Sequence, residues 1–209
     1  MKKALSSNDL LAKKYKLFDF TDEFYDAFDK PEKTGTWFVY GNSGNGKTNF
    51  LLQMIKELAK TERVLYNSLE EGDAHTMQKA WINNNMQDCG RRVQLISEPM
   101  EDLRERLKKH QSPNVIVIDS FQYTWMNFKE YMALKNEFKN KLFIYNSQCE
   151  GKNPMGKTAM KVMYDASLKI WIEGFKAFSK GRYIGKNGGE YVIWEEGAQT
   201  YWGNKQTND

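Results

Sequence analysis

Gly41-Asn42-Ser43-Gly44-Asn45-Gly46-Lys47-Thr48 lies between an apolar run at residues 36–40 and a longer stretch in which apolar residues recur every third or fourth position. The run predicts a strand, and the recurring apolar residues predict an amphipathic helix directly after the glycine-rich segment. This strand–loop–helix order is the context that the phosphate-loop pattern requires. A chance glycine-rich turn is the alternative interpretation, which the agreement of all three parts disfavours.

The chemistry expected of this loop is nucleotide binding. Its glycines allow successive backbone N–H groups to point at phosphate oxygens, and the following helix adds the positive end of its dipole. Lys47 is expected to reach the outer phosphates, and the Thr48 hydroxyl is expected to be a ligand of Mg²⁺. We therefore predict ATP and Mg²⁺ as cofactors. The residues predicted to bind the nucleotide are Asn42, Ser43, Gly44, Asn45, Gly46, Lys47 and Thr48.

A magnesium site needs a carboxylate close to Thr48. The run Val115-Ile116-Val117-Ile118-Asp119 predicts a buried strand that ends in one, as a Walker B element does, so Asp119 is the second predicted metal ligand. A buried strand that merely ends in Asp is the competing interpretation. Its position after the phosphate loop favours the functional one.

The group that orients the attacking water has to come from elsewhere, because Ser120 and Phe121 follow Asp119. The predicted strand at residues 64–67 leads into Ser68-Leu69-Glu70-Glu71-Gly72, which brings carboxylates to the edge where a parallel sheet binds ligands. Glu70 is the predicted base, and Glu71 is the alternative. A solvated acidic turn is the simpler interpretation of the same residues.

The remaining pattern predicts an α/β fold. Further apolar runs at residues 93–97 and 141–145 alternate with amphipathic stretches, which indicates crossover connections and a mostly parallel central sheet covered on both faces. After residue 177, glycines separate two aromatic runs, 191–194 and 200–202, which predict antiparallel strands that extend the sheet. Residues 1–33, rich in Lys, Phe and Tyr, predict an N-terminal arm or interface segment, with core packing of the aromatics as the simpler interpretation, and residues 34–209 form the predicted ATPase domain.

Composition limits the classes of function. The 209 residues include 31 basic and 27 acidic side chains, a net charge of +4 that disfavours a polyanion-coating protein but permits a local basic strip. Two separated cysteines cannot form a disulfide framework or a four-thiolate zinc site, and neither His75 nor His110 has metal-ligand spacing. With no apolar stretch of signal-peptide or membrane-span character, we expect a cytoplasmic protein that does not enter membranes.

The motifs, in this order, resemble those of RecA-like ATPases, and in particular the DnaB-type helicases and the RadA/Sms branch-migration proteins. Residues 68–70 resemble the catalytic-glutamate motif of these helicases, residues 117–122 resemble their Walker B segment, and residues 150–174 are similar to the corresponding RadA segment. The resemblance implies that Gln148, in Asn146-Ser147-Gln148, is a polar sensor of the γ-phosphate. It also implies that Lys180 and Arg182 reach across a subunit interface to the neighbour's nucleotide, although Ile184 intervenes before Gly185 where RadA has Gly directly.

The resemblance implies a three-layer RecA-like sandwich and an oligomer, a hexameric ring or filament, with ATP at the interface. Electrostatics favours a site shared between subunits, because hydrolysis needs positive charge at the γ-phosphate and the phosphate loop supplies only Lys47. The chain matches only the core of those families, as small phage RecA-like recombination ATPases do. We therefore expect an ATPase that acts on single-stranded DNA in recombination or replication.

Candidate DNA contacts follow the sensor. Lys152, Lys157 and Lys161 could track the phosphates of a single strand, and Tyr123 and Trp125 could stack on bases. A solvated basic loop and a packed Trp125 are the simpler interpretations. For the whole chain, a nucleoside or nucleotide kinase and a regulatory ATP switch that acts on a protein partner are the alternative functions.

Overall fold

The computed structural model describes the backbone of residues 4–206 and the side chains of residues 4–203. The helices, of which η1 and η2 are 3₁₀-helices, are α1 (Ser7–Leu11), α2 (Asp22–Phe28), α3 (Lys47–Ala59), α4 (His75–Asn83), η1 (Met86–Arg92), α5 (Met100–Lys108), η2 (Phe121–Thr124), α6 (Phe128–Glu137), α7 (Lys157–Asp165) and α8 (Glu195–Gln206). The strands are β1 (Gly35–Gly41), β2 (Val64–Ser68), β3 (Val93–Ile96), β4 (Val115–Asp119), β5 (Leu142–Glu150), β6 (Asn153–Pro154), β7 (Leu168–Glu173), β8 (Lys176–Ser179) and β9 (Glu190–Val192).

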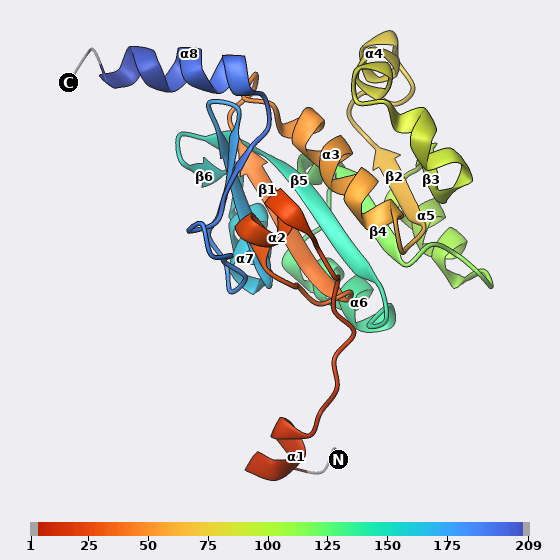
Figure 1. Cartoon of the computed structure of the whole chain (residues 1–209). Coiled ribbons are helices and arrows are strands. Elements are labelled where there is room, and N and C mark those ends of the chain that lie inside the picture. Colours follow the sequence, from red (N-terminus) through yellow and green to blue (C-terminus); the bar gives the residue numbers. More distant parts are fainter. Residues whose placement is uncertain (1–3, 207–209) are drawn as a thin grey trace.

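The strands form one mixed sheet in the order β3-β2-β4-β5-β1-β7-β8-β9, with β6 paired to β5 (Figure 1). The strands from β3 to β7 in this order run parallel, whereas β8 and β9 pair antiparallel at one edge. The predicted α/β fold, with a mostly parallel sheet and an antiparallel C-terminal extension, is confirmed. The five predicted strands coincide with β1 to β5.

Helices cover both faces of the sheet, because alternate residues of each central strand point to opposite sides. Trp37 and Val39 of β1 belong to a core with α2, α3 and α4, whereas Phe38 and Tyr40 belong to a second core with α5, α6 and α7. Both faces of the central strands are apolar, as expected for a buried parallel sheet. The three layers place the carboxyl ends of β1, β2, β4 and β5 at one edge of the sheet.

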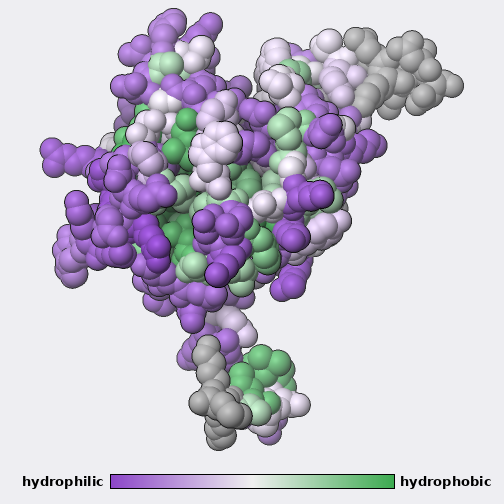
Figure 2. Space-filling view, turned by 180° about the vertical axis from the view of Figure 1, so that it is seen from behind, coloured by the Kyte–Doolittle hydropathy of each residue, from purple (hydrophilic) through white to green (hydrophobic). Residues whose placement is uncertain are grey.

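The N-terminal segment divides into two parts. Phe18 and Phe20 are buried beside Trp37, and Phe28 is buried in the same core against Phe50. Lys16 and Leu17 pair with residues 32–33, and the residues before them extend away from the body and include α1, which forms a separate lobe in Figures 1 and 2. In this lobe Leu11 is 84% exposed, and Leu5 and Leu10 are more than half exposed. The phenylalanines of this segment therefore contribute to the core, whereas Tyr15, Tyr25 and the leucines of the lobe are exposed.

Residues 200–202 form part of α8, so their prediction as a strand is wrong. Glu195 and Glu196 occupy the first turn of α8, where acidic side chains favour a helix, and Tyr201 and Trp202 pack on Gly174 of the β7–β8 turn. This packing outweighs the strand preference of Thr-Tyr-Trp. β7 and β8 lie outside the predicted strands, and β9 takes only Tyr191 and Val192 of the first predicted run.

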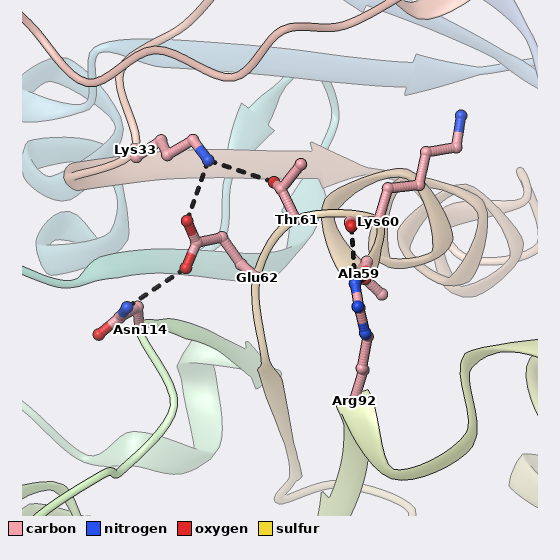
Figure 3. Close-up of polar contacts among 7 residues, drawn as sticks. All are labelled: Lys33, Ala59, Lys60, Thr61, Glu62, Arg92 and Asn114. Atoms are coloured by element: carbon pink, nitrogen blue, oxygen red, sulfur yellow. Dashed lines mark hydrogen bonds and ion pairs between the residues drawn. The ribbon is translucent and has the colours of Figure 1, made fainter.

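The edge of the sheet opposite the carboxyl ends is held by side chains drawn in Figure 3. Lys33 Nζ donates to Thr61 Oγ1 at 3.2 Å and lies 3.0 Å from Glu62 Oε1. Asn114 donates to the other Glu62 oxygen at 3.2 Å. Arg92 donates to the carbonyls of Ala59 at 2.9 Å and Lys60 at 2.6 Å, which satisfies backbone acceptors at the end of α3. In residues 4–206, no helix has the length and apolar character needed to cross a bilayer.

Candidate functional site

The phosphate loop links β1 to α3 and is shaped before any ligand enters. Gly44 and Gly46 have φ values of 77° and 95°, which side chains with a Cβ adopt only at a cost. Gly41 is required for a different reason, since a Cβ there would lie 2.3 Å from the Ile172 carbonyl oxygen of β7. The Asn45 side chain donates to the Ser43 carbonyl at 3.1 Å and accepts from the Gly174 N–H at 2.8 Å. The loop is therefore tied both to itself and to the β7–β8 turn.

Lys47 projects back across the loop. Its ammonium donates to the Asn42 carbonyl at 3.0 Å. Burial lowers the pKa of Lys47, while the carboxylates of Asp119 and Glu70 act in the opposite direction. A partly desolvated cation at this position is a strong partner for an anion.

A cavity of about 370 Å³ opens beside the loop and unites most of the predicted site residues. Its size falls in the range of ligand pockets. The lining residues are Ser43, Gly44, Gly46, Lys47, Thr48, Asn49, Glu70, Glu71, Asp119, Asn146, Gln148 and Phe175. Asn42 and Asn45 lie in the loop but outside this wall, where their contacts maintain the loop's shape.

Asp119 lies at the end of β4 and is only 7% exposed. One carboxylate oxygen accepts from Asn146 Nδ2 at 2.6 Å, and the other accepts from the hydroxyl of Tyr66. Burial raises the pKa of Asp119, although these two hydrogen bonds oppose the shift. The buried carboxylate is thus oriented by two neutral donors, and its charge lacks a counter-ion among its hydrogen-bond partners.

These residues fit a magnesium ion that is held mainly by phosphate and water. No cluster of three or more His, Cys, Asp or Glu side chains suited to a metal occurs among the residues that the structure describes. Mg²⁺ in nucleotide sites needs only one or two protein ligands. Within the described part of the chain, Asn146 Oδ1 is buried without a hydrogen-bond partner beside Asp119, which suits a water molecule of the ion's hydration shell. Thr48 and Asp119 both line the cavity and would hold the ion.

Glu70 and Gln148 meet directly across the cavity. Gln148 Nε2 donates to Glu70 Oε1 at 2.9 Å, and the Glu70 loop is fixed to β4 by two N–H donations to the Asp119 carbonyl, from Leu69 at 2.6 Å and from Glu70 at 3.2 Å. Glu71 instead accepts from Thr76 Oγ1 at 2.8 Å, at the start of α4. Of the two carboxylates, Glu70 is therefore the one that interacts with the predicted sensor.

The sensor is connected to the segment after β5. Gln122 Oε1 accepts from the Gln148 N–H at 3.2 Å, and Gln122 Nε2 donates to the Met155 carbonyl at 3.0 Å. Met155 in turn donates its N–H to the Gln148 carbonyl at 2.9 Å. Gln122 thus joins Gln148 to the residues that lead into α7.

Lys180 and Arg182 lie outside this cavity. β8 runs antiparallel to β7, so its end returns to the amino-terminal end of β7, where the Lys180 N–H donates to Lys169 at 2.7 Å and the Arg182 N–H to Ser167 at 3.3 Å. The phosphate loop follows the opposite end of the neighbouring β1. The two side chains are therefore displaced from their own chain's phosphate site.

Five residues join the site without a role predicted from sequence. Tyr66 and Asn146 hold Asp119, Gln122 holds Gln148, and Asn49 and Phe175 line the cavity. Polar residues inside predicted buried strands were the available signal for Tyr66 and Asn146. Phe175 gives no comparable signal, because only the fold brings it to the loop.

Comparison with known proteins supports the fold. No protein-family model matches the sequence. No curated protein matches it either. Among solved structures, the chain is similar to the flagellar accessory protein FlaH from Methanocaldococcus jannaschii, at 15% identity and a TM-score of 0.58 over 86% of this chain and 92% of that one. It is also similar to a KaiC-like protein from Pyrococcus horikoshii OT3, at 17% identity and a TM-score of 0.59 over 81% of this chain and 94% of that one. The chain therefore has the RecA-like α/β fold, with a mostly parallel central sheet and antiparallel C-terminal strands.

Proposed function

We propose that the protein binds and hydrolyses Mg-ATP and that it works as an oligomer on single-stranded DNA, in the manner of the DnaB-type helicase and RadA/Sms group. One observation carries the proposal. A single cavity contains the phosphate loop, Asp119, Glu70 and Gln148. These are the groups that bind a triphosphate, hold its metal and activate water.

The geometry supports the following proposed roles. Lys47 and the N–H groups of the loop bind the phosphates, and Thr48 and Asp119 hold Mg²⁺, which neutralises charge on the phosphates when bound. Glu70 accepts the proton of the attacking water, and Gln148, 2.9 Å from it, orients the carboxylate and senses the γ-phosphate. Glu71 is not assigned as the base, because its carboxylate accepts from Thr76 at the start of α4.

The DNA contacts are assigned to the residues beyond Gln148 and Gln122. Lys152, Lys157 and Lys161 are exposed, and the nearby side chains of Trp125 and Tyr123 are 89% and 44% exposed. The interpretation of Trp125 as a packed residue is therefore wrong, and its ring is free to stack on a base in the structure described. Gln122 links this region to Gln148, so DNA bound there has a direct route to Glu70.

The oligomer is inferred from charge. The loop supplies one cation, and hydrolysis needs more positive charge at the γ-phosphate. Lys180 and Arg182 point to a site on another copy, since they lie away from their own phosphate loop. ATP would then be bound between subunits, and residues 1–33 would include an arm, 4–17, that has few contacts with its own body.

The experiment is the rate of ATP hydrolysis with and without single-stranded DNA, combined with the particle mass in a non-hydrolysable ATP analogue. We expect DNA to raise the rate and the analogue to raise the mass above that of one chain. Lys47→Ala should abolish turnover, whereas Gln122→Ala, which removes the link between Gln148 and the segment after β5, should lose the stimulation by DNA in larger proportion than the basal rate. No ATP hydrolysis by the wild type under any of these conditions would refute the enzymatic proposal.

A regulatory ATP switch that acts on a protein partner is the second candidate. The fold likeness to a flagellar accessory protein favours it, together with the exposed leucines of α1. ATP hydrolysis that does not respond to single-stranded DNA, in a protein that binds ATP tightly, would support this function over the first.

A further inference from the structure

The turn between β7 and β8 has an unusual residue at its second central position. Glu173 and Lys176 pair, so the loop consists of Gly174 and Phe175 alone, with φ values of 53° and 60°. Two positive φ values are typical of a type I′ hairpin turn, whose positions favour Gly, Asn and Asp. Phe175 therefore occupies a backbone position that disfavours an aromatic residue, and such costs are most often retained at functional sites.

Contacts on both sides fix this turn against the phosphate loop. The Gly174 N–H donates to Asn45 Oδ1 of the loop at 2.8 Å, and the Phe175 carbonyl accepts from the Ile193 N–H at 2.9 Å. A Cβ at Gly46 would lie 3.3 Å from the Phe175 ring, and the ring stacks edge-on to Trp194 with centroids 5.0 Å apart. The ring is thus held next to the first turn of α3.

Phe175 is also the aromatic member of a cavity wall that is otherwise polar, charged or glycine. Phosphates and Mg²⁺ gain nothing from this ring, whereas a nucleobase has a flat face that stacks on aromatic side chains. The half-exposed Trp194 lies beside it and widens the aromatic surface.

We propose that Phe175 is the platform for the base of the bound nucleotide, so that the β7–β8 turn binds the base while the loop at residues 41–48 binds the phosphates. This inference rests on the proposed nucleotide binding. Because a phenyl ring stacks without donating or accepting hydrogen bonds, Phe175 favours larger purine bases over pyrimidines and does not itself distinguish adenine from guanine.

The test compares Mg-ATP with Mg-tripolyphosphate, which has no base, by isothermal titration calorimetry. The variant is Phe175→Asn, because Asn suits the positive φ and keeps the turn intact. We expect the Kd for ATP to rise about tenfold, the Kd for tripolyphosphate to change by less than about twofold, and Phe175→Trp to restore ATP affinity. Phe178→Leu is the matched control, since this half-buried Phe lies on the same hairpin and outside the cavity wall.

The outcomes separate the two proposals. Equal weakening of ATP and tripolyphosphate by Phe175→Asn, or no weakening of either, would overturn the role of Phe175 while nucleotide binding stands. Failure of the wild type to bind both ligands would overturn the proposed function itself.

Discussion

At the scale of single residues, Asp119 combines a functional position with a cost in stability. Its charge is buried with two neutral donors, Tyr66 and Asn146, and with Glu70 and Glu71 close enough to raise its pKa further after burial. A buried carboxylate whose hydrogen-bond partners are all neutral destabilises the folded chain, and the electrostatic interaction with Lys47 does not prevent the pKa of Asp119 from rising. A bound Mg²⁺ would supply further positive charge.

We therefore predict that Asp119→Asn stabilises the metal-free protein while abolishing ATP hydrolysis. Once the Asn146 side-chain amide turns over, so that its Oδ1 replaces Nδ2 beside position 119, the new amide can donate to that oxygen while its own oxygen accepts from Tyr66. We expect the Tm at pH 7 to rise by about 2–4 °C, measured by calorimetry without Mg²⁺. Asp165→Asn is the control, for which we expect a lower Tm. Burial alone would raise the pKa of Asp165, but hydrogen bonds from Lys135 and Tyr131 lower it. The charge of Asp165 therefore stabilises the fold.

The difference in Tm between the wild type and Asp119→Asn should depend on pH. Folded Asp119 binds its proton at a higher pH than unfolded Asp, so its contribution to stability falls as pH rises from the usual value of 3.8 through the raised pKa. The Tm advantage of Asp119→Asn should be absent below that range and grow toward neutral pH. A constant difference across the titration would contradict this account.

Glu70 gives the second prediction at this scale. Glu70→Gln keeps the size of the side chain and removes the base, so the variant should bind ATP with near wild-type affinity and lose turnover by a factor of about 10²–10⁴. Single-turnover hydrolysis and ATP binding are measured on the same sample. Glu71→Gln is the matched control, and a larger loss of turnover in that variant would transfer the role to Glu71.

At the scale of elements, the contact between β1 and β7 limits the residue at position 41. Gly41→Ala would place a methyl group 2.3 Å from the Ile172 carbonyl oxygen, so the strands would have to separate. We expect a loss of about 1–3 kcal/mol in the free energy of unfolding, measured with urea. Gly203→Ala in α8 is the control, because its methyl group would meet nothing within 4 Å, and it should not lose stability. A Gly41→Ala variant as stable as the wild type would contradict this packing.

Strands and helices could be predicted from the sequence where neighbouring residues alone determine them. β1 to β5 are continuous apolar runs, and the order of strand, loop and helix around residues 41–48 is local. Residues 200–202 were predicted wrongly because their helix depends on packing against Gly174, far away in sequence. The contacts of Asp119 with Tyr66 and of Gln148 with Gln122 depend likewise on strand order, which no local pattern specifies.

At the scale of the whole molecule, the two cations that we propose to complete the site lie at the end of the sheet away from their own chain's phosphate loop. Lys180 and Arg182 follow β8, which runs away from the phosphate loop. In the proposed oligomer, the surface that carries the loop would face a different surface that carries these cations, so the interface would be head-to-tail and would close into a ring or continue as a filament.

We predict that two inactive variants restore each other. Lys47→Ala subunits provide Arg182 and Arg182→Ala subunits provide the phosphate loop, so an equal mixture should regain roughly a quarter of wild-type ATP hydrolysis per site if neighbours assort at random. Mixing Lys47→Ala with Glu70→Gln is the control, because both residues belong to the same chain's site and no intact site can form. Absence of recovery at every ratio would refute catalysis across the interface.

Helix α3 connects the phosphate loop, where it begins, to the opposite edge of the sheet, where it ends. It starts at Lys47 in the phosphate loop, and Arg92 clamps the carbonyls at its far end, next to Glu62 and Lys33 (Figure 3). A helix of this length spans about 20 Å and resists compression along its axis. Lys33 bonds Thr61 and Glu62 just beyond the end of α3, and its N–H donates to the Lys16 carbonyl at the base of the N-terminal arm. A displacement of α3 at the phosphate loop would therefore reach this arm through one stiff element, without passing through the sheet.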